Sequence, residues 1–246
     1  MRNYPLVADR PSRFELPFHL FHALMPSLPS KASLAEFLPP VRNQGNEGSC
    51  SAFSGCTVME TLLRKFRNDD TILSPAFLYE VERYIGGDLY DDSGAQLIQT
   101  QYALQQVGVC PEADDKYTSA DFVVGIDQKL IQDAAKYRIS KGFAVSNLQQ
   151  IKQAIAEGLP VQLGIVVYAS FESDEVAKTG LIPMPQSGEQ CMGGHAVACF
   201  GYDDEKQLLS VRNSWGQSWG DYGNFYLPYS FVENPNLLMS ARVYEL

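Results

Sequence analysis

The pattern of apolar residues changes near Gly158, and this change constrains the fold more than any other feature of the chain. Segments before it carry apolar residues at helical spacing, whereas segments after it are short runs rich in Val, Leu, Tyr and Phe, which favour strands. Helices followed by a set of antiparallel strands are typical of an α+β protein, here with two lobes. The sequence predicts helices over 50–67, 73–84, 94–108 and 146–158, and strands over 159–168, 195–204, 207–215, 222–229 and 238–246.

Local signals support these boundaries. Ser74 followed by Pro75 is typical of a helix start. Gly108 and Gly158 each follow a helical pattern, where glycine commonly ends a helix. Residues 1–38 are rich in proline and lack a clear period, so we expect an irregular N-terminal arm.

The charge balance limits the partners. The formal net charge is −10 and the basic residues form no block, so we expect neither nucleic acid nor an anionic membrane as a partner. The acidic surface is expected to keep the protein soluble. The alternative interpretation is a preference for basic substrates.

There is no run of 18 apolar residues, so no transmembrane helix is expected. Pro17, His19 and His22 interrupt the N-terminal apolar stretch, so we expect a cytoplasmic protein, or one exported without a cleaved signal peptide.

The five cysteines are odd in number and lack the spacing of a dense disulfide framework. A mostly reduced protein fits this pattern, although one or two bridges in an exported protein remain open. Cys191 and His195 lie four residues apart, but the chain has no CxxC and only three histidines. We therefore expect no metal and no organic cofactor.

Cys50 stands in the stretch QGNEGSCSAF, residues 44–53, at the first position of a predicted helix. A helix N-terminus has unpaired N–H groups and a positive partial charge, and both favour a thiolate by lowering its pKa. Gly45, Gly48 and Ser49 add little bulk, so the sulfur could be reached. Alone, this motif leaves open that the cysteine only fills the start of a helix.

His195 and Asn213 supply the partners that a thiolate nucleophile needs. His195 follows two glycines in GGHAVACFGY, and an imidazole can pair with the thiolate and later protonate the leaving group. Asn213, in RNSWGQSWG on the next strand, can accept from one ring nitrogen and leave the other facing the sulfur. Trp215 could cover that hydrogen bond and exclude water.

The motifs QGNEGSC, GGHAV and NSWG, in this order, resemble the papain-like cysteine peptidases. The resemblance runs from about Pro39 to Tyr244 and includes LSPAFLY, GVCPE and GLPVQLGIVVY, which look like bacterial members. It implies one peptidase domain over 39–246 with a papain-like two-lobed α+β fold. A helical lobe at about 45–145 and an antiparallel, barrel-like β lobe at about 146–246 would enclose the active-site cleft.

By position, the resemblance implies that Cys50 is the nucleophile, His195 the general base and acid, and Asn213 the residue that orients the imidazole. Gln44 matches the side chain that holds the oxyanion together with the Cys50 backbone N–H. Trp215 matches the indole that shields the asparagine.

Three glycines match substrate subsites of the family. Gly94 falls near the stretch that pairs with the substrate backbone, and Gly164 and Gly193 fall at the main specificity pocket. Two glycines would leave a wide pocket, so we expect tolerance of a bulky apolar residue. A preference for alanine in a peptide library would contradict this.

The chain departs from the family in three places. Ser51 follows the nucleophile, where the family usually has tryptophan or tyrosine. Glu47 takes the place of a disulfide cysteine, so that bridge is expected to be absent, and its carboxylate could tune the cleft. The arm, residues 1–38, is too short for the long helical propeptide. It is either a strap across the lobes or an autoinhibitory segment, and we favour the strap.

These features predict a monomeric cysteine peptidase that hydrolyses peptide bonds in peptide or protein substrates through a thioester. A protein inhibitor is a further partner to consider. Two alternatives stay open: an acyl-transfer enzyme that passes the thioester to an amine, and a catalytically silent peptide-binding homologue, to which Ser51 points.

Overall fold

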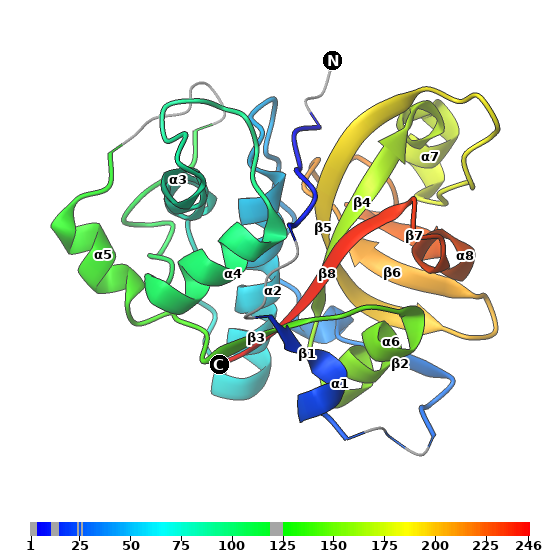
Figure 1. Cartoon of the computed structure of the whole chain (residues 1–246), viewed down its shortest axis with the longest axis horizontal. Coiled ribbons are helices and arrows are strands. Elements are labelled where there is room, and N and C mark those ends of the chain that lie inside the picture. The colour runs from blue at the N-terminus through cyan, green and yellow to red at the C-terminus, as the bar shows by residue number, and fades with distance from the viewer. Residues whose placement is uncertain (1–3, 11–14, 24, 26, 119–124) are drawn as a thin grey trace.

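A computed structural model describes residues 4–10, 15–23, 25, 27–118 and 125–246, and it shows two lobes side by side (Figure 1). The helical lobe comprises α2 (Cys50–Arg67), α3 (Pro75–Gly86), α4 (Leu97–Gln106) and α5 (Gln128–Ala134). The second lobe is built on a sheet, with α6 (Leu148–Glu157), α7 (Asp174–Thr179) and α8 (Tyr229–Glu233) around it. The predicted two-lobed α+β fold is confirmed.

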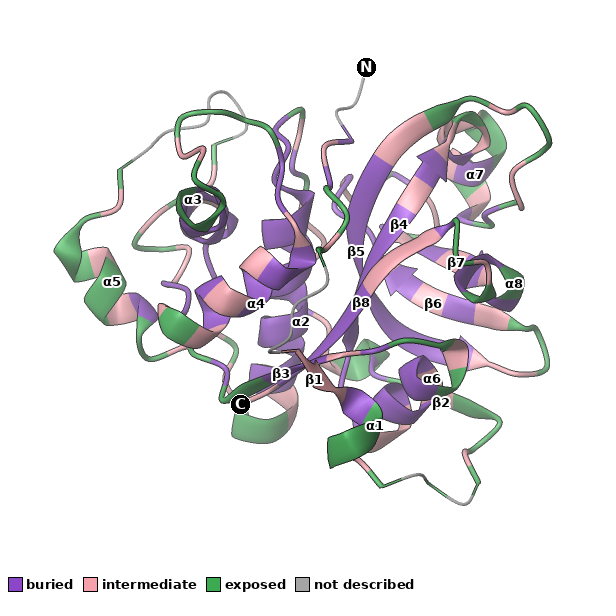
Figure 2. Ribbon diagram, viewed as in Figure 1, coloured by how far each residue is buried: buried purple, intermediate pink, exposed green. Residues whose placement is uncertain are grey.

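Helix α2 lies between the lobes and packs against α3 and α4 on one side and against β4 and β5 on the other. Its bounds equal the predicted 50–67, and it ends at Asn68 in the left-handed conformation, with φ of 51°. Most of its length is buried (Figure 2), including polar side chains such as Ser51, Thr57 and Glu60. A helix buried this way gives its first residue a fixed position relative to both lobes.

The other predicted helices are also present, with the expected caps. The Ser74 Oγ accepts from the Phe77 N–H at 3.0 Å at the start of α3. Asn147 caps α6, which ends at Gly158 with φ of 93°. Helix α4 begins at Leu97 rather than at residue 94, so Gly94 lies in the segment before the helix, with φ of 76°.

The sheet has the strand order β1-β3-β8-β4-β5-β6-β7, and β2 pairs with β5. All pairings are antiparallel except that of β1 with β3. Among the described residues β1 and β7 do not pair with each other, so the sheet is open where a barrel-like lobe was expected. The strands are β1 (Leu16–Pro17), β2 (Lys31–Ser33), β3 (Lys141–Ala144), β4 (Val161–Tyr168), β5 (Cys191–Asp203), β6 (Leu208–Arg212), β7 (Asn224–Pro228) and β8 (Leu238–Glu245).

The N-terminal arm is more regular than its sequence suggested. It contributes β1 and β2 to the sheet and also contains α1 (Phe18–Phe21) and a 3-10 turn, η1 (Ala35–Phe37). Phe18 is buried and packs edge-on against Phe143 of β3, with ring centroids 6.3 Å apart. Strands of two or three residues are too short to show an apolar period in the sequence. They form here by pairing with strands more than a hundred residues away.

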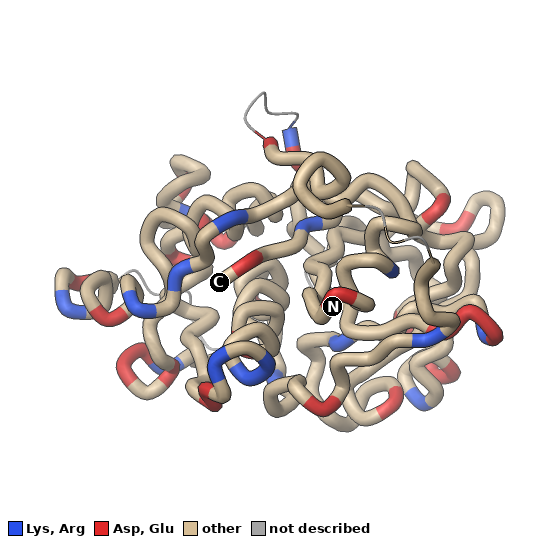
Figure 3. The backbone as a smooth tube through the Cα atoms, turned by 90° about the horizontal axis from the view of Figure 1, so that it is seen from below, with Lys and Arg blue, Asp and Glu red and all other residues tan. Residues whose placement is uncertain are grey.

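Lys and Arg positions are scattered among Asp and Glu positions over both lobes (Figure 3). All five cysteines are free thiols. Among the described helices, none combines the length and the apolar content that crossing a bilayer requires.

Candidate active site

Cys50 is the first residue of α2, as predicted, but its sulfur is not open to solvent. The residue is 1% exposed and packs in a small cluster with Leu6, Leu97 and Ala196. Burial raises the pKa of the Cys50 thiol to about 12, and the Glu82 carboxylate adds to the rise, while a hydrogen bond with the Ala196 backbone lowers it. The expected lowering of the thiol pKa by the helix start is therefore outweighed, because a buried thiolate loses its hydration.

His195 and Asn213 form the pair that the motifs predicted. The His195 Nε2 and the Asn213 Oδ1 are 2.8 Å apart, and the Ser214 N–H donates to the same oxygen at 2.9 Å. Since that oxygen already accepts from a backbone N–H, the imidazole Nε2–H donates to it, which leaves Nδ1 as the basic nitrogen. Cys50 contacts Ala196, the residue after His195, so α2 and β5 bring the thiol beside the strand that carries the imidazole.

The Trp215 ring stacks on the His195 imidazole, with centroids 4.9 Å apart and planes 25° apart. Trp219 packs edge-on against Trp215 at 4.8 Å and stacks on Phe171 at 5.7 Å. The aromatic cluster shields the imidazole from water and fixes the plane of its ring. Trp219 was not among the residues predicted from the sequence, although its spacing from Trp215 in SWGQSW was a signal.

Gln44 is buried and held in place at both ends of its side chain. Its Nε2 donates to the Glu47 carbonyl at 2.9 Å, and its Oε1 accepts from the Ser214 Oγ at 2.5 Å. The backbone N–H of Gln44 donates to the Ser214 carbonyl at 2.9 Å, which ties it to the residue after Asn213. An amide nitrogen carries two hydrogens, so one remains for an oxyanion.

Glu47, at the position of the missing disulfide cysteine, is buried. Burial raises its pKa to about 7, and the nearby Asp92 carboxylate raises it further, while hydrogen bonds with Ser49 and Tyr117 lower it. Asp92 also accepts from the Gly48 N–H at 2.9 Å, so the segment that leads to Cys50 is tied to the segment around Gly94 without a disulfide.

The three glycines of the predicted subsites all lie against the N-terminal arm. A Cβ added to Gly94 would stand 2.1 Å from the Pro5 carbonyl oxygen, and one added to Gly193 would stand 2.5 Å from the Tyr4 carbonyl oxygen. A Cβ on Gly164 would stand 2.9 Å from a methyl group of Leu6. The arm therefore occupies the place where a substrate was expected, and only glycine leaves room for it.

Residues 4–7 of the arm pair with both lobes. The Leu6 N–H donates to the Gly194 carbonyl and the Gly194 N–H donates to the Tyr4 carbonyl, each at 3.2 Å. On the other side, the Val7 N–H donates to the Ala95 carbonyl at 3.1 Å. The Tyr4 ring stands edge-on to the His195 ring, with centroids 6.1 Å apart. These contacts explain why Cys50 and His195 are each only 1% exposed.

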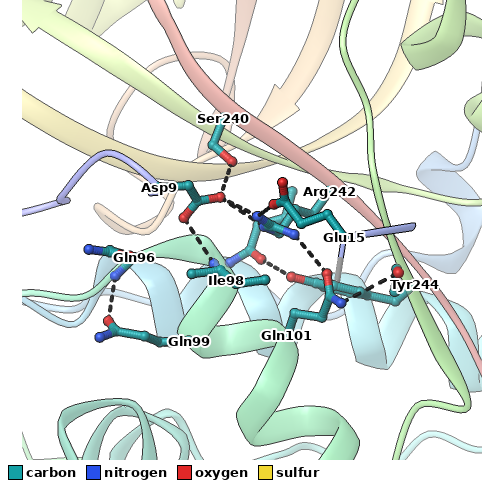
Figure 4. A network of polar contacts seen from close by, with 11 residues as sticks. Asp9, Glu15, Gln96, Ile98, Gln99, Gln101, Ser240, Arg242 and Tyr244 are labelled. Atoms are coloured by element: carbon teal, nitrogen blue, oxygen red, sulfur yellow. Dashed lines mark hydrogen bonds and ion pairs between the residues drawn. The ribbon is translucent and has the colours of Figure 1, made fainter. Parts of the chain in front are cut away.

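Asp9 then fixes the arm to both lobes (Figure 4). Its carboxylate accepts from the Ile98 N–H of α4 at 3.0 Å and from the Ser240 Oγ of β8 at 2.5 Å. It also accepts from the Arg242 guanidinium at 2.9 and 2.6 Å. Arg242 is almost fully buried and has a second anionic partner in Glu15. The arm thus lies across the site and is anchored beyond it by a buried ion pair.

A model of the family "Papain family cysteine protease" matches residues 29–239. The chain belongs to this family. A solved structure of xylellain, a cysteine protease from Xylella fastidiosa, is 30% identical, with a TM-score of 0.88, and the alignment covers 100% of this chain and 97% of that one.

Two curated relatives of this papain-family chain are longer than it is. An uncharacterized peptidase C1-like protein of Acanthamoeba polyphaga mimivirus is 34% identical over 205 residues, which cover 79% of this chain and 66% of the relative. Mouse cathepsin K is 31% identical over 195 residues, which cover 76% of this chain and 55% of the relative. The chain thus spans slightly more than half to about two thirds of their length.

Proposed function

We propose that this chain is a cysteine peptidase that cleaves peptide bonds through a thioester on Cys50. The thiolate attacks the peptide carbonyl, and the Gln44 Nε2–H and the Cys50 backbone N–H hold the oxyanion. His195 then protonates the amine as the C–N bond breaks. Water, deprotonated by His195, attacks the thioester, and the acid and the free thiol are released. Each oxyanion donor contributes about 10²–10³ in turnover.

The observation that carries this proposal is the His195–Asn213 hydrogen bond under Trp215, next to the helix that begins with Cys50. An imidazole whose Nε2–H is held by an amide oxygen presents a basic Nδ1, which is what a thiol nucleophile requires. The family match supports the same chemistry. An acyl-transfer enzyme would share the thioester, so product analysis by mass spectrometry in the presence of an amine separates the two.

The test is labelling with an epoxide thiol probe combined with a peptidase assay. Cys50→Ala should abolish both the label and the activity, whereas Cys191→Ala, which changes the exposed cysteine, should abolish neither. Full activity in Cys50→Ala would refute the proposal. Labelling of Cys50 without any turnover, even when residues 4–9 are displaced from the site, would instead support the silent homologue.

We also propose that residues 4–9 of the arm keep the peptidase closed, so the autoinhibitory alternative replaces the strap that the sequence favoured. Leu6 fills the space bounded by Gly164, Leu97 and Ala196, where a substrate side chain would bind. Its fit supports a preference for an apolar residue of leucine size in that pocket. Burial under the arm also raises the pKa of the Cys50 thiol, which keeps it protonated until the arm leaves.

Two matched substitutions test the closed state in the full chain. Leu6→Asp places a charge in the apolar pocket, whereas Val7→Asp places the same charge on a neighbour that is 46% exposed. We expect Leu6→Asp to raise the initial rate of peptide hydrolysis and Val7→Asp to leave it near the wild-type value. A strap without inhibitory function predicts that Leu6→Asp lowers the melting temperature with no gain in rate.

A further inference from the structure

Glu82 of α3 lies fully buried behind the nucleophile, and both of its oxygens are engaged. The Ser51 Oγ donates to Oε2 at 2.5 Å, and the Thr100 Oγ1 of α4 donates to Oε1 at 2.6 Å. Both partners are hydroxyl groups rather than cations. The neighbouring Arg83 directs its guanidinium to the segment after α3, where it binds the Asp91 carbonyl and Ser93.

Ser51, the residue next to Cys50, also forms a hydrogen bond with a residue of the sheet. Its carbonyl accepts from the Gln162 Nε2 of β4 at 2.9 Å, and the same nitrogen donates to the Ser54 Oγ at 2.8 Å. The Tyr244 hydroxyl of β8 donates to the Gln162 Oε1. The first turn of α2 is therefore tied to α3 and α4 in one lobe and to β4 and β8 in the other, entirely within buried surroundings.

The charge of this carboxyl matters for the thiol. Burial raises the pKa of Glu82 to about 8, while the hydrogen bonds from Ser51 and Thr100 and the nearby charge of Arg83 lower it. Glu82 in turn raises the pKa of Cys50, and it acts in the same direction on Cys56 and Tyr244. Below about pH 8 the carboxyl is mostly neutral, so it holds Ser51 without opposing a thiolate; once ionised, it opposes one.

We propose that Glu82 is a positioning residue of the nucleophile: through Ser51 it fixes the first turn of α2, and in its neutral form it leaves no like charge behind the Cys50 thiolate. The effect on turnover rests on the proposed peptidase function, whereas the effect on the thiol does not. Ser51, which stands where an aromatic residue was expected, thereby has a role of its own, because its hydroxyl donates to the buried carboxyl.

The first test measures the rate at which iodoacetamide modifies Cys50 in the full chain between pH 6 and 11, with the modified peptide identified by mass spectrometry. Glu82→Gln keeps an acceptor for Ser51 but cannot ionise, so the pKa of Cys50 should fall and the alkylation rate at pH 10 should rise about tenfold. Glu80→Gln removes the same charge two residues away on α3, where the carboxylate accepts from the Gly125 and Ile126 N–H groups, and should keep the wild-type rate.

The second test uses Ser51→Ala, which cuts the tether and keeps the charge. We expect kcat to fall about tenfold and KM to change less than twofold, because the nucleophile loses its position and the pocket does not. Equal alkylation rates at pH 10 in Glu82→Gln, Glu80→Gln and the wild type would overturn the proposal, as would an unchanged kcat in Ser51→Ala.

Two further variants keep the tests separable. If Glu82→Gln does not fold, Thr100→Val removes one hydroxyl that lowers the pKa of Glu82, so the carboxyl should ionise at higher pH and the alkylation rate near pH 9 should rise. An unchanged rate near pH 9 in Thr100→Val would then count against the charge effect. Peptidase activity in Cys50→Ala would refute the proposed function alone, since the alkylation profile reports on Glu82 without any turnover.

Discussion

Replacing Asp9 by asparagine should release the arm from the site. The substitution keeps the size of the side chain but removes the charge that accepts from Ile98, Ser240 and Arg242. An asparagine can satisfy one of these donors with its oxygen, while its NH₂ group cannot accept from the guanidinium. Arg242, which is 1% exposed, would keep Glu15 as its only carboxylate partner among the described residues.

The size of the effect follows from these contacts. Removing one partner of a buried ion pair costs about 3–5 kcal/mol. Glu15 and the Gln101 Oε1, which accepts from Arg242 at 2.9 Å, stay in place and moderate the loss. We therefore take the low end, about 3 kcal/mol, which corresponds to about a 150-fold change in the ratio of closed to open arm. If the closed form dominates in the wild type, the initial rate should rise by a comparable factor, up to the point where the arm is mostly open.

The assay is the initial hydrolysis rate of a short fluorogenic peptide with leucine in the pocket position, measured on the intact full-length chain. Mass spectrometry after the assay confirms that the arm has not been cut. Glu36→Gln, an exposed change of the same charge in η1, serves as the matched control and should leave the rate unchanged. An Asp9→Asn rate within twofold of the wild type would refute the anchoring role of Asp9.

Three further predictions concern buried polar groups. Because burial raises the pKa of Glu47 to about 7, its protonated form stabilises the fold; this contribution is complete below about pH 4.5 and is lost as the pH rises through 7. Glu47→Gln cannot ionise, so its melting temperature relative to wild type should rise from pH 5 to pH 8, and a constant difference would contradict this. Asn213→Ala should lower kcat/KM about 100-fold in enzyme titrated for active sites, because the imidazole loses its orientation. Arg42→Met leaves Glu60, whose carboxylate lies 3.0 Å from the guanidinium, buried without its cation; urea unfolding should show a loss of about 3 kcal/mol, and a loss below 1 kcal/mol would count against the pair.

Much of the fold was predictable from local patterns. The range 50–67 was recovered without error because α2 has both a clear apolar period and basic residues in its last turn. The five strands after Gly158 were also found, since their composition and turn residues are local properties. The predictions failed for β1, β2 and β3, which are two to four residues long and form only because a distant strand offers a pairing edge.

The site likewise has features that were predictable from the sequence and features that depend on contacts between distant residues. The sequence predicted which residues carry the chemistry. The structure places the Asn213 Oδ1 at the His195 Nε2, Trp215 over the His195 ring, and Gln44 beside Ser214. The catalytic roles themselves stay predictions until the variants are measured. The sequence also showed that Ser51 departs from the family pattern. Its hydrogen-bond partner Glu82 lies on another helix, so spacing along the sequence could not identify it.

The order of motifs along the chain was enough to determine the family, the two lobes and the helix that begins with Cys50, because periodicity, caps and residue type act over a few neighbours. The environment of the thiol was decided by the tertiary structure alone. The helix start by itself favours a thiolate, yet Leu6 and Tyr4, more than forty positions upstream, close the site and remove the sulfur from water. Desolvation depends on every group that surrounds an atom, and no local stretch of sequence contains that information.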